Sequence, residues 1–326
     1  MRRRDALAGL FALCALPRAA FASPDKPRRI GFLGPPLAPD GQPFLDAFRG
    51  GLKALGYAEG GNYLIEYREV PGLTPEPTRL TLALELVALR VDVIVASVTR
   101  NALAAKAATS QIPIVMVNVG AVDSGLATSL DKPGDNLTGL SLNATALAHR
   151  NLELLLEAVP ACERVGILAN PTNPLHPKMI VNLRRTARAR GHKRHIAQIS
   201  SAGEIERAVA SMTREKVGAM LVLGDALFSS NRRRIVELAL SHHLPTMFQN
   251  ALFADAGGLM SYAPDLLENY RVAAAYVDRL LKGAKPDDLP TVQPPKFDLV
   301  LNLKTARALG LAIPPGILKQ AQRVIE

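Results

Sequence analysis

Residues 256–311 read AGGLMSYAPDLLENYRVAAAYVDRLLKGAKPDDLPTVQPPKFDLVLNLKTARALGL. The apolar run from Gly258 to Tyr262 predicts a strand, and an amphipathic helix that begins near Asp265 follows it. A connector with four prolines then leads to a second short strand, Phe297 to Leu301. This order indicates a chain that crosses between two lobes.

The rest of the chain alternates apolar runs with amphipathic stretches, in two units of similar size. The predicted strands are 29–33, 63–67, 92–96 and 113–117 in the first unit, and 165–168, 194–199, 219–223 and 245–248 in the second. Strands that are apolar throughout, rather than at every second residue, are typical of parallel sheets covered by helices on both faces. The predicted fold class is therefore α/β, with two doubly wound parallel-sheet lobes.

We expect three crossings between these lobes: near Leu140–Asn143, near Ala254–Gly257, and within Gly283–Lys296. They predict an N-terminal lobe of residues 27–141, a C-terminal lobe of residues 142–255, a return to the N-terminal lobe over 256–284, and a return to the C-terminal lobe over 285–326. Three crossings make a hinge, because they hold two lobes in register while the lobes open and close.

The first 22 residues have the pattern of a signal peptide. Three arginines follow Met1, residues 6–16 are apolar, and Ala20-Phe21-Ala22 supplies small residues for cleavage after Ala22. The apolar run is shorter than the roughly 20 residues that a membrane helix needs. We therefore expect a periplasmic protein with no stable membrane insertion after cleavage, exported by the general secretory or the twin-arginine route.

Charge and cysteine content exclude several classes of protein. The formal net charge of +10 becomes +7 without residues 1–22, which hold four arginines and one aspartate. The densest basic run, 184–194, is interpreted as a solvated helix face, and no aromatic residues are interleaved with it, so no nucleic-acid partner is expected. Cys162 is the single cysteine of the mature chain, which rules out an intramolecular disulfide, and we interpret it as a core residue.

Ligands of parallel sheets bind beyond the carboxyl ends of the strands, where helix N-termini also point. The loops at these positions carry the candidate ligand-binding residues Pro36, Ser97, Thr99, Arg100, Asn118, Asp123, Asn170, Thr172, Asn173, Asp225, Phe228, Gln249 and Asn250. Hydroxyls and helix N–H groups suit the carboxylate of a zwitterionic solute, and Asp123 or Asp225 suits its ammonium. The alternative for each residue is structural: helix capping by Thr99 or Asn173, loop ordering by Asp225, and core packing by Phe228.

Catalytic motifs are absent from the sequence. It contains no Gly-x-Ser-x-Gly, no HExxH and no phosphate-binding GxxxxGK[ST] pattern. We therefore expect no catalytic residues, no metal, no cofactor and no enzymatic activity.

Several short segments, in this order and spacing, resemble the ABC-transporter substrate-binding proteins of the tryptophan/tyrosine-binding type. They include Ile30-Gly-Phe-Leu33, Leu137-Thr-Gly139, Asn170-Pro-Thr-Asn-Pro174 and Ala256-Gly-Gly-Leu-Met-Ser-Tyr262. The resemblance implies a periplasmic-binding-protein fold of type I, a three-segment hinge and no catalysis. The chain departs from the family at Val98-Thr99-Arg100, where members often carry Gly and Pro, and at Val122-Asp123-Ser124. The ligand is therefore not transferred from the family.

The expected function is that of an extracytoplasmic solute-binding protein of an ABC importer. It would close its lobes on a small polar, amino-acid-like ligand, aromatic or branched, and deliver that ligand to a permease with its ATPase. The alternatives are a ligand-sensing module for a receptor kinase and an enzyme on a two-lobe α/β scaffold.

Overall fold

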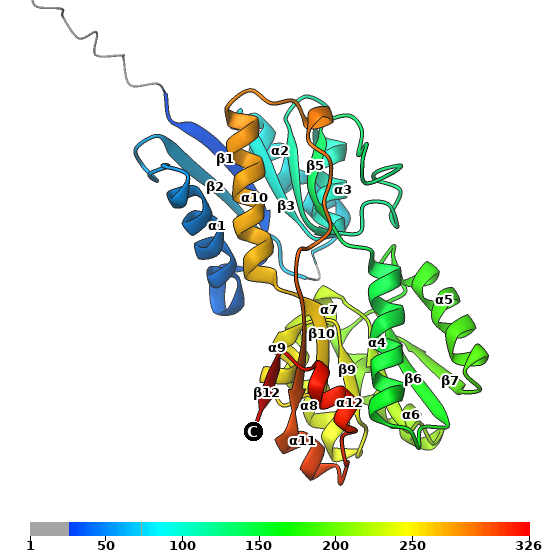
Figure 1. Cartoon of the computed structure of the whole chain (residues 1–326). Helices are drawn as coiled ribbons and strands as arrows, with labels where there is room; N and C mark the ends of the chain where they lie inside the picture. The colour runs from blue at the N-terminus through cyan, green and yellow to red at the C-terminus, as the bar shows by residue number, and fades with distance from the viewer. Residues whose placement is uncertain (1–25, 73) are drawn as a thin grey trace, which may run out of the picture.

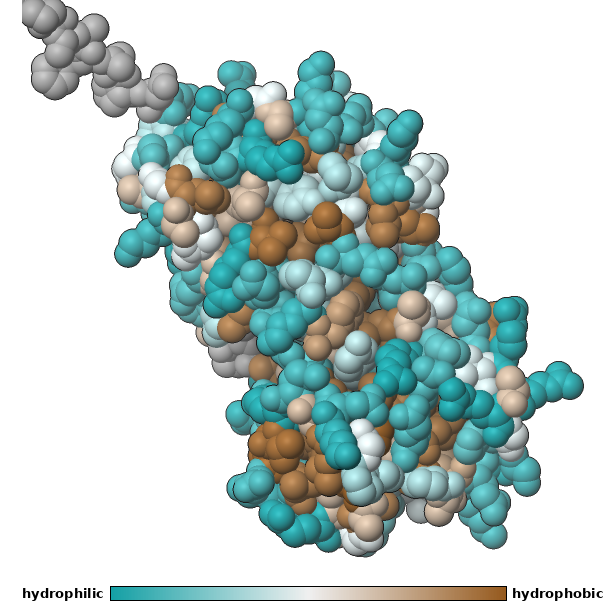
Figure 2. Space-filling model, viewed as in Figure 1, coloured by the Kyte–Doolittle hydropathy of each residue, from teal (hydrophilic) through white to brown (hydrophobic). Residues whose placement is uncertain are grey.

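The computed structural model describes residues 26–72 and 74–326, so the predicted signal peptide lies outside the described residues. The chain forms two α/β lobes, one above the other in Figure 1, connected by three segments. No helix in the described part of the chain is long and apolar enough to cross a membrane. The surface in Figure 2 is mostly hydrophilic, with scattered apolar side chains.

The N-terminal lobe is built on a five-stranded parallel sheet in the order β2-β1-β3-β4-β5. Its strands are β1 (Arg28–Gly34), β2 (Tyr63–Glu69), β3 (Val93–Ser97), β4 (Ile114–Val119) and β5 (Leu137–Ser141). Helices α1 (Gln42–Ala54) and α10 (Leu266–Leu281) cover one face, and α2 (Glu76–Ala88) and α3 (Thr99–Ala108) cover the other. A short π-helical turn, η1 (Leu37–Gly41), precedes α1, and a 3-10 turn, η3 (Pro286–Asp288), follows α10.

The C-terminal lobe has a seven-stranded sheet in the order β12-β11-β10-β9-β8-β6-β7. Its strands are β6 (Arg164–Ala169), β7 (Lys193–Gln198), β8 (Ala219–Val222), β9 (Thr246–Phe248), β10 (Met260–Pro264), β11 (Phe297–Asn302) and β12 (Arg323–Ile325). On one face lie α4 (Ala144–Ala158), α5 (His176–Ala189), α11 (Leu303–Ala308) and α12 (Pro315–Gln320). On the other lie η2 (Ala202–Glu204), α6 (Ile205–Arg214), α7 (Ala226–Ser230), α8 (Arg232–Ser241) and α9 (Ala251–Asp255).

The hinge contains three crossings, and the second lies further along the chain than the sequence suggested. The first crossing is residues 142–143, between β5 and α4, and the third leads to β11 after Val292 has bridged to Leu140 of the N-terminal lobe. The expected second crossing near Ala254–Gly257 is wrong. Strand β10 buries Met260 between β9 and β11, so residues 256–264 belong to the C-terminal lobe and the chain crosses at Asp265.

The second sheet is mixed rather than purely parallel. Strand β10 runs parallel to β9, whereas β10 and β11 are antiparallel. The hinge explains this, because β10 ends at the second crossing and β11 begins at the third. Two adjacent strands that respectively approach and leave the same hinge must run in opposite directions.

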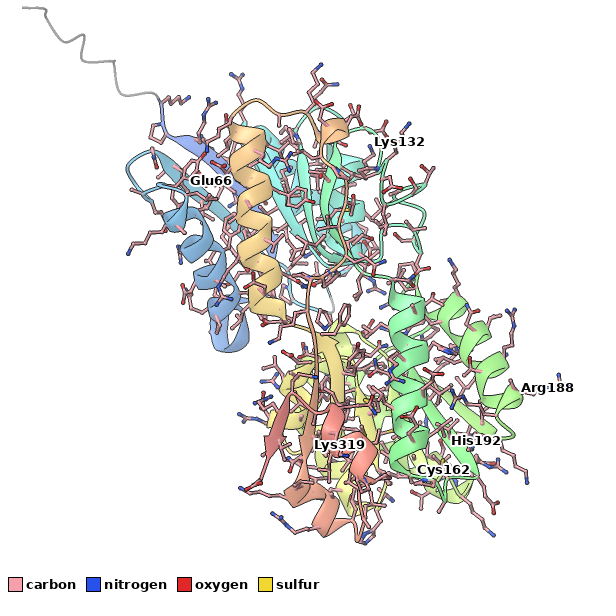
Figure 3. All side chains as sticks on the ribbon, viewed as in Figure 1. Glu66, Lys132, Cys162, Arg188, His192 and Lys319 are labelled. Carbon is pink, nitrogen blue, oxygen red and sulfur yellow. The ribbon has the colours of Figure 1, made fainter. Side chains whose placement is uncertain are left out.

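Two interpretations of single residues are settled by burial. Cys162 is buried in the core of the C-terminal lobe, and burial raises the pKa of its thiol to about 11. Its carbonyl oxygen lies 2.7 Å from Nδ1 of His192, near the end of the lobe that faces away from the hinge (Figure 3). Arg188, in the basic run, points from α5 into solvent, as expected for a solvated helix face.

Candidate ligand-binding site

The carboxyl ends of the parallel strands in both lobes point toward the junction between them. The loops after β3 and β4 therefore meet the loop after β6. Arg100 donates to both oxygens of Thr172 on the opposite lobe, with 2.8 Å to the hydroxyl. Lys178 of α5 forms an ion pair of 2.8 Å with Asp123. Three of these four side chains, Arg100, Thr172 and Asp123, were predicted from strand ends, whereas Lys178 was not; together they join the two lobes across their junction.

Asp225 is the centre of a polar network on the C-terminal lobe. Its carboxylate accepts hydrogen bonds from Asn170 Nδ2 at 3.1 Å, from Asn173 Nδ2 at 2.8 Å, and from the Leu227 N–H at 2.8 Å. Asn170 Oδ1 in turn accepts from the backbone N–H and the hydroxyl of Thr172. Asp225 therefore orders the loops after β6 and β8 and caps α7, which is the structural alternative for this residue.

His176 also connects the loops after β6 and β8, and it was not among the predicted site residues. Its side chain is buried, Nδ1 accepts from the Asn170 N–H at 2.9 Å, and Nε2 lies 3.2 Å from the Gly224 carbonyl. Because Nδ1 accepts from a backbone N–H, the ring proton lies on Nε2, which faces the Gly224 carbonyl. Burial lowers the pKa of the imidazole, against the opposing effect of Asp225. Its position in the sequence, two residues after Pro174 and at the start of α5, could have marked it as a strand-end residue.

The loop after β3 is held by buried polar groups. Ser97 Oγ donates to the Leu33 carbonyl at 3.2 Å, and Thr99 Oγ1 accepts from the Gly120 N–H at 3.1 Å. Val98 between them has φ 58°, a conformation that glycine adopts more readily than a β-branched residue. Ser97 and Thr99 therefore serve to position the loop that carries Arg100.

Arg79 also holds the loop after β3 in place, and it was not among the predicted site residues. Its guanidinium is buried, donates to Asn101 Oδ1, and donates to the Thr74 carbonyl at 3.0 Å. Burial lowers the pKa of this guanidinium. Arg79 thereby links the start of α3 to the segment before α2, and no sequence pattern marked it.

The remaining candidates have other contacts. Asn118 accepts a hydrogen bond from Asn269 at the start of α10, beside the second crossing. Gln249 accepts from the Gly224 N–H at 2.6 Å, and Asn250 caps α9 through the Leu252 N–H.

Phe228 is fully buried in the core of the C-terminal lobe, so its prediction as a ligand contact is wrong. The same core cluster includes Leu168 of β6 and Ile235 of α8.

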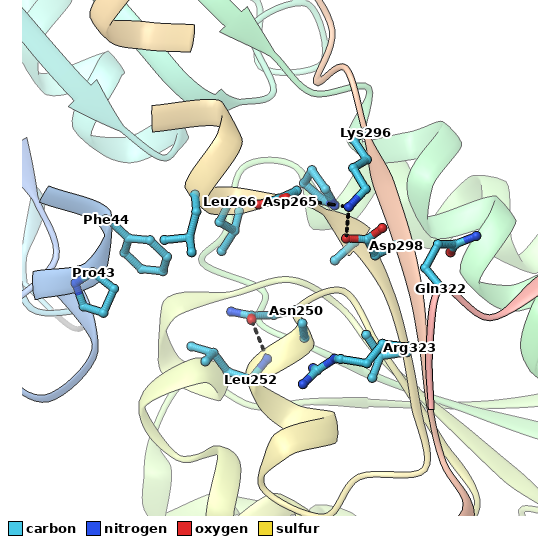
Figure 4. A pocket seen from close by; sticks show the side chains of 15 residues that line it. Pro43, Phe44, Asn250, Leu252, Asp265, Leu266, Lys296, Asp298, Gln322 and Arg323 are labelled. Carbon is cyan, nitrogen blue, oxygen red and sulfur yellow. Dashed lines mark hydrogen bonds and ion pairs between the residues drawn. The ribbon is translucent and has the colours of Figure 1, made fainter. Parts of the chain in front are cut away.

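At least two hollows lie between the lobes in the part of the chain that the structure describes. The smaller, of about 270 Å³, is lined by Arg100, Asn170 and Thr172 together with Thr74, Pro75, Glu76 and Ser200. The larger, of about 570 Å³, lies between the starts of α1, α9 and α10 and is lined by Asn250 alone among the candidates (Figure 4). Pro36, at the start of η1, lines neither hollow.

Comparison with known proteins identifies relatives of the whole two-lobed chain. The chain is 27% identical to a tyrosine-binding protein of Clostridioides difficile (strain R20291), over 82% of this chain and 78% of that protein. A Streptococcus pneumonia ABC domain in complex with L-Trp has a TM-score of 0.81 and 26% identity, covering 92% of this chain and all of the other. A glucose-galactose binding protein from Geobacillus stearothermophilus shares the fold at a TM-score of 0.62 and 12% identity, over 85% of this chain and 98% of that one.

These relatives confirm the predicted fold class and the predicted resemblance. The two-lobed architecture is that of type I periplasmic binding proteins, and it joins two α/β sheets through a hinge. The model of the family described as ABC transporter substrate binding protein matches residues 42–325. Members of this family are binding proteins rather than enzymes. The chain belongs to the ABC transporter substrate-binding protein family.

Proposed function

We propose that this substrate-binding protein takes up a small amino-acid-like solute with an aromatic or branched side chain, by closing its two lobes on it. The proposal rests mainly on one observation. The loops that follow the strands of one lobe face those of the other lobe beside a three-segment hinge, and Arg100 contacts Thr172 of the opposite lobe. A tyrosine-binding relative and an L-Trp complex support the choice of solute class. Export to the periplasm, with cleavage near Ala22, and delivery to a permease with its ATPase complete the proposal.

Lobe closure is how such a protein shows the permease that it holds a solute. A solute that binds between the lobes contacts both of them only in the closed form, so it stabilises that form over the open one. The permease then distinguishes loaded from empty protein by the angle between the lobes. The Arg100–Thr172 and Lys178–Asp123 contacts join the two lobes and are among those that an opening motion would have to break.

Thermal unfolding of the mature chain, residues 23–326, with a panel of L-amino acids tests the solute class. A solute present at 100 times its dissociation constant adds about 2.7 kcal/mol to the free energy of unfolding. The unfolding entropy of a chain of this size is about 0.6 kcal/mol/K, so we expect the melting temperature to rise by about 4 °C with tyrosine, tryptophan or a branched amino acid. An unchanged melting temperature with every amino acid would contradict the proposal.

A further inference from the structure

The positive charge of the mature chain is concentrated in one segment. The full chain has a formal net charge of +10, and residues 1–22 account for +3 of it. Residues 164–203 contain eight lysines and arginines and no aspartate or glutamate, so they account for another +8. The remaining residues of the mature chain therefore have a net charge of −1. The basic character of this protein belongs to one part of the C-terminal lobe and is not spread over the molecule.

The centre of this segment is the outer side of α5. Val181 is 56% exposed and marks the side of the helix that faces solvent. At 3.6 residues per turn, Arg184, Arg185 and Arg188 all lie within about 60° of it around the helix axis. The opposite side of α5 packs into the core of the C-terminal lobe. The three arginines therefore form one exposed stripe, and Figure 3 shows Arg188 pointing away from the lobe.

The strand after α5 widens this stripe into a surface. Lys193 and Arg194 are exposed at the start of β7, which packs beside α5 and is the edge strand of the sheet. Both elements lie on the same outer side of the C-terminal lobe in Figure 1. We call the set of five residues the basic face: Arg184, Arg185, Arg188, Lys193 and Arg194.

The basic face has no partner within the protein. None of its five side chains forms a hydrogen bond or an ion pair within residues 26–72 and 74–326. A group of like charges without internal partners keeps its field for an external anion. The three other bases of the segment are paired: Arg164 with Glu215, Lys178 with Asp123, and Arg190 with Glu153.

The form of the basic face suits an extended anionic surface better than a single ligand. The 14 residues of α5 span about 21 Å, so the charges are spread along the helix. Residues 164–203 include no aromatic residue on which a nucleic-acid base could stack. None of the five residues lines either hollow between the lobes, so they form no part of those pockets. A bilayer with anionic head groups needs neither feature, because it attracts clusters of Lys and Arg by charge density alone.

We infer that the basic face binds the surface of an anionic lipid bilayer. The C-terminal lobe then lies on the membrane by the outer side of α5, and no residue enters the hydrocarbon. Binding of this kind is reversible and concentrates the protein at the surface where the permease of an ABC transporter lies. The inference does not depend on the identity of the solute, because the five residues lie outside both hollows.

Sedimentation of the wild-type mature chain, residues 23–326, with lipid vesicles tests the inference without any mutation. At low salt the protein is expected to bind vesicles of phosphatidylcholine with about one-third phosphatidylglycerol, and not vesicles of phosphatidylcholine alone. Binding is expected to disappear at about 1 M salt, where the Debye length falls to about 3 Å. Absence of binding at low salt, or equal binding to both kinds of vesicle, would overturn the inference.

A triple variant locates the binding surface. Each Lys or Arg near an anionic bilayer contributes about fivefold to the binding constant, so Arg184→Gln, Arg185→Gln and Arg188→Gln together are expected to weaken binding by about a hundredfold. Lys193 and Arg194 stay in place, because charges on an edge strand also oppose its pairing with other sheets. Unchanged binding by this variant would overturn the inference.

The matched control removes the same charge elsewhere. Arg233→Gln, Arg279→Gln and Arg307→Gln change three exposed arginines on α8, α10 and α11. This control is expected to keep most of the wild-type affinity for the vesicles. Equal losses in the two triple variants would overturn the inference, because they would show attraction by net charge alone.

Two soluble polyanions distinguish the lipid surface from other anionic partners. Poly-L-glutamate and a single-stranded oligonucleotide are expected to bind the mature chain more weakly than the phosphatidylglycerol vesicles do. Tighter binding of either one would overturn the inference in favour of an acidic protein or a nucleic acid. Melting temperatures show that the triple variants are folded, and the wild-type lipid and salt series decides if one is not.

Discussion

Alanine at position 139 is expected to lower the free energy of unfolding by more than about 4 kcal/mol, enough to prevent folding of the N-terminal lobe. Gly139 lies in β5 with φ +113°, and a Cβ there would lie 2.5 Å from the Met116 carbonyl oxygen and 2.7 Å from its nitrogen. Both atoms belong to the backbone of β4, so no side chain can move aside. Gly139 also accepts the Val292 N–H at 3.0 Å, which holds the third crossing to the N-terminal lobe.

Gly134→Ala is the matched control for this variant. Gly134 also has a positive φ, of +81°, but no atom lies within 4 Å of its Cβ position. Only the conformational cost of about 1–2 kcal/mol is then expected. Urea unfolding followed by circular dichroism measures both variants, and similar losses for the two would show that the contact with Met116 is unimportant.

Asp225→Ala is expected to lower the free energy of unfolding of the solute-free protein by about 3–5 kcal/mol. The carboxylate accepts from Asn170, Asn173 and the Leu227 N–H, and its removal leaves those donors without their acceptor. The buried Asn170 amide has the least access to water in compensation. If the role of Asp225 were only to meet a ligand ammonium, the empty protein would keep its stability.

Asn143→Ala separates this network from ordinary helix capping. Asn143 caps α4 through one hydrogen bond to the Ala146 N–H, and its loss is expected to cost about 1 kcal/mol. Differential scanning calorimetry without solute compares the two variants. A loss for Asp225→Ala no greater than that for Asn143→Ala would contradict the assignment of Asp225 as the residue that orders two loops.

Regular strands were predictable from the sequence because parallel strands are buried on both faces and so are apolar throughout. Strand β5 was not, since Thr138 and Gly139 interrupt its apolar pattern within a segment rich in glycine and asparagine. Thr138 is nevertheless fully buried, because its hydroxyl donates to the Leu289 carbonyl at 2.7 Å. That partner comes from the third crossing, about 150 residues later, and no local pattern announces it.

One part of the candidate site was predictable from local sequence and the other was not. The strand-end rule brought Arg100, Asn170 and Thr172 together correctly, because it depends only on where strands stop. The larger hollow is built from the starts of three helices and from two crossings, and Phe44 and Lys296 both line it although they lie far apart in the sequence. Only the placement of the second crossing at Asp265, rather than near Ala254–Gly257, reveals it.

Lobe closure on a solute is tested most directly by pulsed electron paramagnetic resonance between spin labels on the two lobes. Cysteines replace Leu84 on α2 and Val181 on α5, which are 47% and 56% exposed, while the native Cys162 is buried and its thiol pKa is raised. On addition of a saturating amino acid we expect the distance distribution to narrow and to shift to shorter distances. An identical distribution with and without a solute whose binding has been measured by titration would contradict closure of the two lobes on the ligand.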